Sequence, residues 1–135
     1  MEIGGEGAIV TGGGSGLGEA TARHLAGLGA KVVILDFDET RGAAVAADLG
    51  CHFVKADVSR EADVEAAYTY AMDAIGAAPR IAVNCAGIGT AARIVGREGK
   101  LSTDVFERTL RVNLLGSYFV MSHAARAIQW QDPAN

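Results

Sequence analysis

The sequence has little cysteine, no excess of positive charge and no long uninterrupted apolar run. Its two cysteines, Cys51 and Cys85, cannot build a disulfide framework in a chain of 135 residues, which indicates a reducing setting. Twelve Lys and Arg residues against sixteen Asp and Glu residues give a net charge of −4, so no basic surface is expected for nucleic acid or an anionic membrane. The most apolar long stretch, residues 112–128, contains Asn, His and Arg and is a poor transmembrane candidate.

Other absences narrow the class of protein further. The first five residues lack the basic and apolar regions of a signal peptide, so we expect a soluble, cytoplasmic protein without a nucleic-acid or membrane partner. Because 50% of the residues are hydrophobic and 21% are charged, disorder is excluded, and residues 1–135 are predicted to form one domain. The three histidines, His24, His52 and His123, have no Cys or Asp partner at metal-ligand spacing, and no metal site is expected.

A glycine-rich segment at residues 11–18 stands between a short apolar run and a segment with helical spacing. That order predicts a strand, a tight turn and a helix N-terminus, in which Gly12, Gly16 and Gly18 let the backbone approach a ligand. The free N–H groups and the dipole of the first helical turn favour an anionic pyrophosphate there. A purely structural turn between a strand and a helix would also use glycine, and this alternative stays open for the motif alone.

Asp36 favours the nucleotide interpretation of that turn. It ends the next apolar strand, eighteen positions after Gly18. At about this distance from the glycine turn, a carboxylate would meet the hydroxyls of an adenosine ribose. A solvated strand end is the alternative for this residue.

Four apolar strands alternate with four helical segments along the chain. Right-handed crossovers then predict an α/β fold, with a Rossmann-like, doubly wound parallel sheet in the order 3-2-1-4. Thr11, Asp36, Asp57 and Asn84 fall at the strand ends, where strands 1 and 4 diverge and a ligand would bind. The expected strands are residues 8–10, 31–37, 51–58 and 80–87, the last running into a turn, and the expected helices are residues 16–28, 39–49, 59–75 and 102–128.

Apolar spacing and end signals describe these helices in more detail. Ser59 is expected to cap the third helix, Ser102 or Thr103 to cap the last, and Pro133 to end it. The buried faces are expected to carry Leu17, Thr21, His24, Leu25 and Leu28 in the first helix, and Val64, Tyr68, Met72 and Ile75 in the third.

Five motifs in this order resemble the N-terminal half of a short-chain dehydrogenase/reductase, and the resemblance covers the whole chain. Within that family, the amino-acid sequence of residues 83–88 and the lengthened loop before the last helix are most similar to those of the type 2 3-hydroxyacyl-CoA dehydrogenases. The motifs are Thr11-Gly12-x-x-x-Gly16-x-Gly18, Asp36, Asp57-Val58, Asn84-Cys85-Ala86-Gly87 and Asn113.

The resemblance implies how the glycine turn would hold a cofactor. Gly12, Gly16 and Gly18 would form the pyrophosphate turn, and Ser15 and the backbone of Leu17 would help to line it.

The strand ends would hold the adenosine. Asp36 would accept hydrogen bonds from the ribose, and its charge would repel a 2′-phosphate, which favours NAD over NADP. Asp57 would face the adenine amino group and Val58 the adenine ring, although Asp57 could equally be a helix-capping residue before Ser59. A helical, exposed arginine is the commoner explanation of nearby Arg41, which weakens the NAD assignment only slightly.

The fourth strand end would complete the cofactor site. Asn84 would tie the central sheet, while Cys85 and the small Ala86 and Gly87 would lie against the cofactor. Many family members carry a second Asn where this chain has Cys85, and a buried, inert thiol is the default interpretation of that cysteine.

Asn113 is the candidate catalytic residue. It lies inside the last helix, where asparagine is mildly unfavourable. In the family this residue holds a water in a proton relay from the catalytic lysine, through its backbone at a helix kink and its side chain. Simple hydrogen bonding in the core is the alternative.

The sequence lacks the family's Tyr-x-x-x-Lys, because none of its three tyrosines has a lysine four positions later. The Ser that orients the substrate carbonyl would follow in the family's fifth strand, so we expect a fold truncated before strand 5 and inactive alone. The last helix forms subunit contacts in the family, and the complete protein is expected to be a homo-oligomer, a dimer or a tetramer. Its apolar stripe, Phe106, Leu110, Leu114 and Met121, would then divide between core and oligomer interface.

Two functional hypotheses follow. The first is an NAD-dependent short-chain oxidoreductase that transfers hydride between NAD(H) and a secondary alcohol or ketone, with a 3-hydroxyacyl-CoA as a candidate substrate. The second is a noncatalytic nucleotide-binding or interaction module. A methyltransferase-like domain would share the glycine turn but gives no reason for residues 84–87 and Asn113. The basic residues Arg93, Arg97 and Lys100 could attract CoA phosphates, or simply solvate a loop.

Overall fold

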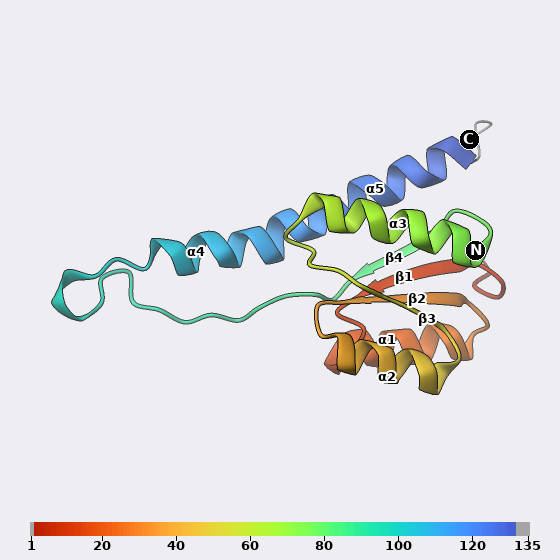
Figure 1. The fold of residues 1–135 in the computed structure, drawn as a ribbon, viewed down its shortest axis with the longest axis horizontal. Coiled ribbons are helices and arrows are strands. Elements are labelled where there is room, and N and C mark those ends of the chain that lie inside the picture. The colour runs from red at the N-terminus through yellow and green to blue at the C-terminus, as the bar shows by residue number, and fades with distance from the viewer. Residues whose placement is uncertain (1, 132–135) are drawn as a thin grey trace.

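A four-stranded parallel sheet forms the centre of the molecule (Figure 1). The computed structural model describes residues 2–131. Strands β1 (Gly7–Thr11), β2 (Lys31–Asp36), β3 (His52–Lys55) and β4 (Ile81–Asn84) lie in the order β3-β2-β1-β4, and every pairing is parallel. The predicted Rossmann-like, doubly wound sheet in the order 3-2-1-4 is therefore confirmed.

Central strands β1 and β2 are apolar because helices cover both of their faces. Ile9, Val10, Val33 and Ile34 are fully buried, as expected for the inner strands of a parallel sheet. The third strand is shorter than the predicted 51–58 because the chain turns away from the sheet after Lys55.

Two helix layers enclose the sheet (Figure 1). Helices α1 (Gly16–Gly27) and α2 (Glu39–Leu49) cover one face, where their apolar residues pack with Ala8, Val10, Val32 and Ile34. Helices α3 (Glu61–Ile75) and α5 (Gly116–Gln131) cover the other face. That second core contains Ile9, Val33, Leu35, Val64, Tyr68 and Val120.

The helix ends follow local chemistry, with one correction. The Asp38 side chain accepts a hydrogen bond from the Arg41 N–H at 3.0 Å and begins α2, and Gly76, with φ of 79°, ends α3. The N-cap of α3 is Arg60, so the prediction that Ser59 caps this helix is wrong. Ser59 instead donates to the Asp57 carboxylate, which places it in the preceding turn.

Helix α1 also faces the core differently from the prediction. Its buried residues are Gly18, Ala22 and Leu25, whereas Leu17 is 83% exposed. The close approach of Gly18 to the backbone of the glycine turn fixes the rotation of the helix. Of the predicted stripe, therefore, only Leu25 is buried.

The predicted last helix is a rod of three segments. Helix α4 (Thr103–Leu110) continues through a π-helical turn, η2 (Arg111–Leu115), into α5. Ser102 takes the N-cap position, but its hydroxyl donates to the Arg93 carbonyl oxygen rather than to the helix. Pro133, predicted to end the helix, lies outside the described residues. Within residues 2–131, no helix has the length and apolarity needed to cross a membrane.

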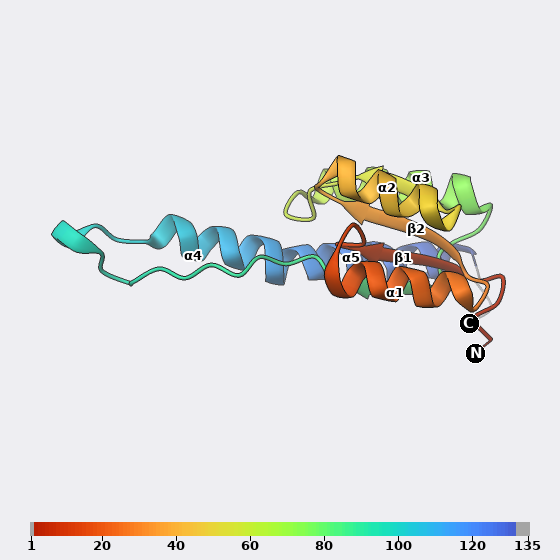
Figure 2. The same cartoon turned by 90° about the horizontal axis from the view of Figure 1, so that it is seen from below.

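Helix α4 and the preceding loop project beyond the sheet as an arm (Figures 1 and 2). The loop includes a short 3-10 turn, η1 (Arg97–Gly99), and one antiparallel bridge between Val95 and Leu101. The apolar stripe of the rod is largely outside the core. All four of its residues, Phe106, Leu110, Leu114 and Met121, are exposed in the described chain, so their division between core and oligomer interface in the complete protein stays a prediction.

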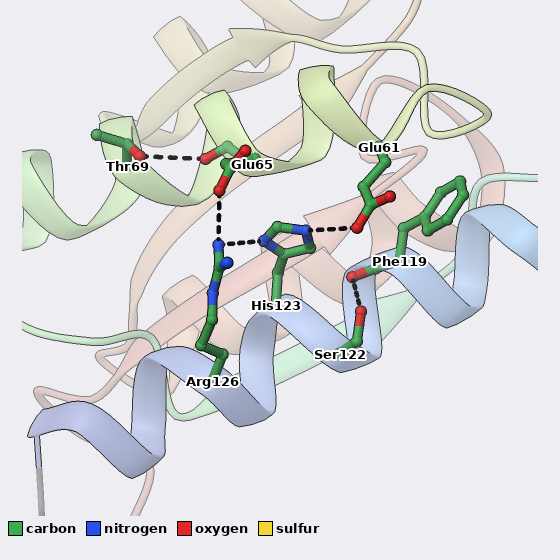
Figure 3. A network of polar contacts seen from close by, with 7 residues as sticks. All are labelled: Glu61, Glu65, Thr69, Phe119, Ser122, His123 and Arg126. Carbon is green, nitrogen blue, oxygen red and sulfur yellow. Dashed lines mark hydrogen bonds and ion pairs between the residues drawn. The ribbon is translucent and has the colours of Figure 1, made fainter.

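Helix α5 is held to α3 by a polar network around buried His123 (Figure 3). A guanidinium nitrogen of Arg126 lies 2.8 Å from His123 Nδ1 and 2.9 Å from Glu65 Oε1. Because arginine can only donate, Nδ1 accepts, and the ring proton sits on Nε2, which faces Glu61 at 3.6 Å. The His123 ring also stacks on Tyr68 of α3, with centroids 6.1 Å apart.

Candidate functional site

A cavity of about 490 Å³ opens at the carboxyl ends of the strands. Five segments of the chain form its wall: the glycine turn with the start of α1, the end of β2, the loop after β3, the turn after β4, and the junction of α4 with η2. The lining residues are Gly12, Ser15, Gly16, Leu17, Gly18, Leu35, Asp36, Phe37, Ala56, Asp57, Val58, Ser59, Cys85, Ala86, Gly87, Ile88, Arg108, Arg111 and Val112.

The glycine turn leaves no room for a side chain at Gly12 or Gly18. Gly12 and Gly16 have positive φ, 66° and 55°. A Cβ on Gly12 would lie 2.8 Å from the Ala86 nitrogen, and one on Gly18 would lie 2.1 Å from the Gly12 carbonyl oxygen. At Gly12 and Gly18 the turn is therefore packed backbone against backbone, and the start of α1 lines the cavity, which suits an anionic group.

Thr11 joins the glycine turn to the turn after β4. Its buried hydroxyl oxygen accepts hydrogen bonds from the backbone N–H groups of Cys85, at 3.2 Å, and Ala86, at 3.1 Å. Gly12 N–H also donates to the Leu35 carbonyl oxygen at 2.8 Å. These bonds hold three strand ends at fixed separations around the cavity.

Both carboxylate oxygens of Asp36 are oriented by backbone groups. Oδ2 accepts from Gly14 N–H and Oδ1 accepts from Asp38 N–H, each at 2.8 Å. A carboxylate has about four lone-pair sites, so each oxygen can accept a further hydrogen bond. Asp36 is therefore fixed at the cavity wall with acceptor capacity to spare.

Asp57 and Val58 line the cavity from the loop after β3. One Asp57 oxygen accepts from Ser59 N–H at 3.0 Å and from Ser59 Oγ at 2.6 Å, which makes Asp57 a turn residue and not the cap of α3. Val58 is buried and contacts the rod at Gly116, where a Cβ would lie 2.8 Å from a Val58 methyl carbon. Their contacts to adenine stay a prediction.

Asn113 sits in the π-helical turn and binds the backbone of Ile88. Its Oδ1 accepts from Ile88 N–H at 2.8 Å, and its Nδ2 donates to the Ile88 carbonyl oxygen at 2.9 Å. The Asn113 carbonyl oxygen accepts from Ser117 Oγ at 2.9 Å. The side chain thus fixes the turn after β4 to the rod, and its role in a proton relay stays a prediction.

The structure therefore brings most of the predicted site residues to one cavity. Asn113 and Asn84 are the exceptions, since neither lines it. Asn84 is an exposed residue at the end of β4, paired in register with Thr11, and its role as a tie in the sheet stays a prediction.

Sequence reasoning missed the wall that the rod contributes. Arg108, Arg111 and Val112 line the cavity and lie three and four positions apart, a spacing that places them on one helix face. That spacing was a usable signal, but only the fold shows that this face meets the glycine turn.

A second cavity of similar volume lies between the arm's loop and α4, where it is lined mainly by apolar residues and threonines. It contains none of the predicted site residues. Among the described residues, no group of three or more His, Cys, Asp or Glu side chains could hold a metal ion.

The chain is similar to curated proteins that include 3-hydroxyacyl-CoA dehydrogenases type-2. It is 42% identical over 130 residues to human 3-hydroxyacyl-CoA dehydrogenase type-2, an alignment that covers 93% of this chain and 49% of that protein. It is 42% identical to the sex determination protein tasselseed-2 of Zea mays, covering 90% of this chain and 37% of that protein. The chain thus spans half or less of the length of these curated relatives.

Comparison with solved structures agrees with these sequence similarities. A 3-ketoacyl-(acyl-carrier-protein) reductase from Brucella melitensis, solved in complex with NADH, superposes with a TM-score of 0.86 and 35% identity, covering 97% of this chain and 53% of that one. The family model for short chain dehydrogenases matches residues 6–134. With the glycine turn, the acidic end of β2 and the sheet order all in place, the chain belongs to the short-chain dehydrogenase/reductase family.

Proposed function

We propose that the chain is the nucleotide-binding part of an NAD-dependent oxidoreductase that transfers hydride between NAD(H) and a secondary alcohol or ketone. The observation that carries this proposal is the position of Asp36. Its carboxylate is held at the cavity wall by Gly14 N–H and Asp38 N–H, beside the glycine turn. A fixed negative charge there favours a ribose diol and disfavours a 2′-phosphate.

The cavity wall fits an adenine dinucleotide. A Cβ on Gly12 or Gly18 would collide with backbone, so at these positions the backbone of the turn and the start of α1 can approach a pyrophosphate. Asp36 can accept ribose hydroxyls, and Asp57 and Val58 border the space next to it. When bound, NAD would supply the hydride acceptor, while these residues would bind and orient it.

Asn113 would act in positioning. By holding both backbone polar groups of Ile88, it sets the turn after β4 at the cavity wall. The same proposal includes a role for Asn113 in a proton relay, in which it would hold a water beside the π-helical turn.

The substrate class extends the proposal. Human and bovine 3-hydroxyacyl-CoA dehydrogenases type-2 are similar to this chain at 42% and 41% identity, which supports a 3-hydroxyacyl-CoA substrate. A homo-oligomeric complete protein is supported by the exposed apolar residues of the rod. We also propose a cytoplasmic location, on the basis of the low cysteine content.

A noncatalytic nucleotide-binding module is the second candidate, because the sequence contains no Tyr-x-x-x-Lys. The structure adds that Tyr68 is buried between α3 and the sheet, away from the cavity lining. The 135-residue chain alone is proposed to bind nucleotide without turnover.

Two measurements on the protein as its source produces it separate these functions. Fluorescence titration with NADH and NADPH should show tighter binding of NADH, and oxidation of a 3-hydroxyacyl-CoA should reduce NAD. NADH binding without turnover of any alcohol or ketone would favour the noncatalytic module. Absence of binding to either dinucleotide would refute both.

A further inference from the structure

The rod places two arginines in the wall of the nucleotide cavity. Arg108 lies in the last turn of α4, and Arg111 is the first residue of the π-helical turn. Both line the same cavity as the glycine turn. Val112, on the same face, packs partly buried against the core beneath α3. Since Val112 anchors this face, the rotation of the rod that aims both arginines at the cavity is set by packing.

Neither guanidinium has a carboxylate within 4.0 Å in the part of the chain that the structure describes. By contrast, Arg23, Arg60 and Arg126 each pair with a carboxylate. The two carboxylates of the cavity, Asp36 and Asp57, bond to backbone N–H groups and to Ser59, and neither pairs with these arginines. The rod thus presents to the cavity two guanidinium groups that form no ion pair within the described residues.

Their neighbours indicate which end of a nucleotide they would meet. Val58 contacts Gly116 at the start of α5, so the loop carrying Asp57 and Val58 lies against the same rod that carries the arginines. The glycine turn, which suits the pyrophosphate, belongs to the start of α1 instead. A planar guanidinium stacks on an aromatic face, and adenine offers such a face.

We propose that Arg108 and Arg111 form the outer wall of an adenine site and hold the base by guanidinium stacking. The proposal rests on the proposed function, since it concerns how the same cavity takes the dinucleotide. The arginines would raise affinity for every ligand that contains adenine, and would contribute nothing to the nicotinamide end.

The test compares Arg111→Gln and Arg108→Gln with Arg97→Gln, which removes the same charge from η1, outside both cavities described above. NADH affinity is measured by fluorescence in the protein as its source produces it, with AMP and nicotinamide mononucleotide as competitors. Loss of a stacked guanidinium should weaken NADH and AMP about three- to tenfold. Nicotinamide mononucleotide affinity, and all affinities of the Arg97 variant, should stay unchanged.

A conservative variant separates stacking from charge. Arg111→Lys keeps the charge but loses the planar group, and should weaken AMP nearly as much as Arg111→Gln. Full rescue by lysine, or unchanged AMP affinity in both glutamine variants, would overturn the adenine wall while leaving NADH binding, and so the proposed function, intact. If the unmodified protein does not bind NADH at all, the proposed function itself fails.

Discussion

The backbone N–H of Gly14 donates to a carboxylate oxygen of Asp36 at 2.8 Å, across 22 positions of sequence. The residue proposed to select the ribose therefore also orders the turn proposed to hold the pyrophosphate. A substitution of Asp36 acts on both, so cofactor preference, rather than affinity alone, is the informative quantity.

Asp36→Ala should weaken NADH and NADPH together through the loosened turn, and NADH more, since the ribose acceptor is lost and repulsion of the 2′-phosphate disappears. The ratio of the two affinities should shift toward NADPH by about tenfold. Titrations of each variant with NADH and with NADPH measure this ratio. Asp36→Asn keeps an acceptor for the Gly14 N–H and should shift the ratio with less loss of affinity. An unchanged ratio in both variants would contradict the ribose assignment.

Gly18→Ala should damage the site and the fold together. The new Cβ would lie 2.1 Å from the Gly12 carbonyl oxygen, which is backbone and cannot swing away. We expect the free energy of unfolding to fall by about 2–3 kcal/mol, with loss of nucleotide binding. Urea denaturation measures the change in the free energy of unfolding.

Gly27→Ala is the matched control in the same helix, because its Cβ would meet nothing within 4 Å. Alanine favours the helix over glycine, so this variant should gain about 0.5–1 kcal/mol. If the two variants destabilised equally, steric closure at Gly18 would not be the cause.

Thr11→Val removes the hydroxyl that accepts from Cys85 and Ala86. Cys85 N–H keeps the Thr11 carbonyl oxygen at 3.2 Å as an acceptor, so the loss falls mainly on Ala86. The expected cost is about 1–2 kcal/mol of unfolding free energy. Thr11→Ser retains the hydroxyl acceptor and should recover most of the lost unfolding free energy. If the serine variant were no more stable than the valine variant, the hydrogen bond to Ala86 would not be the cause.

Tyr68→Phe should stabilise the protein. The Tyr68 hydroxyl is buried and has no hydrogen-bond partner among the described residues. Removing it relieves a desolvation cost, and we expect a gain of about 1 kcal/mol at neutral pH. Chemical denaturation of both proteins measures the difference.

The pH dependence checks the same residue independently. Burial raises the pKa of Tyr68 above its ordinary value of 10.0, so the unfolded chain releases this proton first, and its contribution to stability falls as pH rises above about 10. Tyr68→Phe should remove that part of the slope. Tyr70→Phe, at an exposed site of the same helix, should keep it.

Much of the fold followed from the sequence because its signals are local. The apolar runs of β1 and β2, the glycines that end α2 and α3, and the alternation of elements each depend on neighbouring residues. Parallel order then follows from the handedness of the crossovers. For the same reason, the glycine turn and Asp36 could be assigned to one site.

What the sequence did not predict depends on long-range packing. The exposure of Leu17 reflects a helix rotation set by Gly18, whereas periodicity alone favoured the neighbouring face that carries Leu17 and Thr21. Phe106 is exposed because α4 runs past the sheet edge, which no local pattern encodes. Arg108 and Arg111 line the cavity only because the fold places the rod against it, which the sequence around them does not encode.

The hydrogen bond from Cys85 to Thr11 spans 74 positions of the chain. Closing so large a loop costs entropy before any contact compensates for it, so we expect such contacts to form late in folding. Strand β1 can pair with β2 after a single crossover, whereas the wall supplied by residues 85–88 waits until β4 has docked. A nucleotide would therefore bind only chains that have finished folding, and would draw the population toward them.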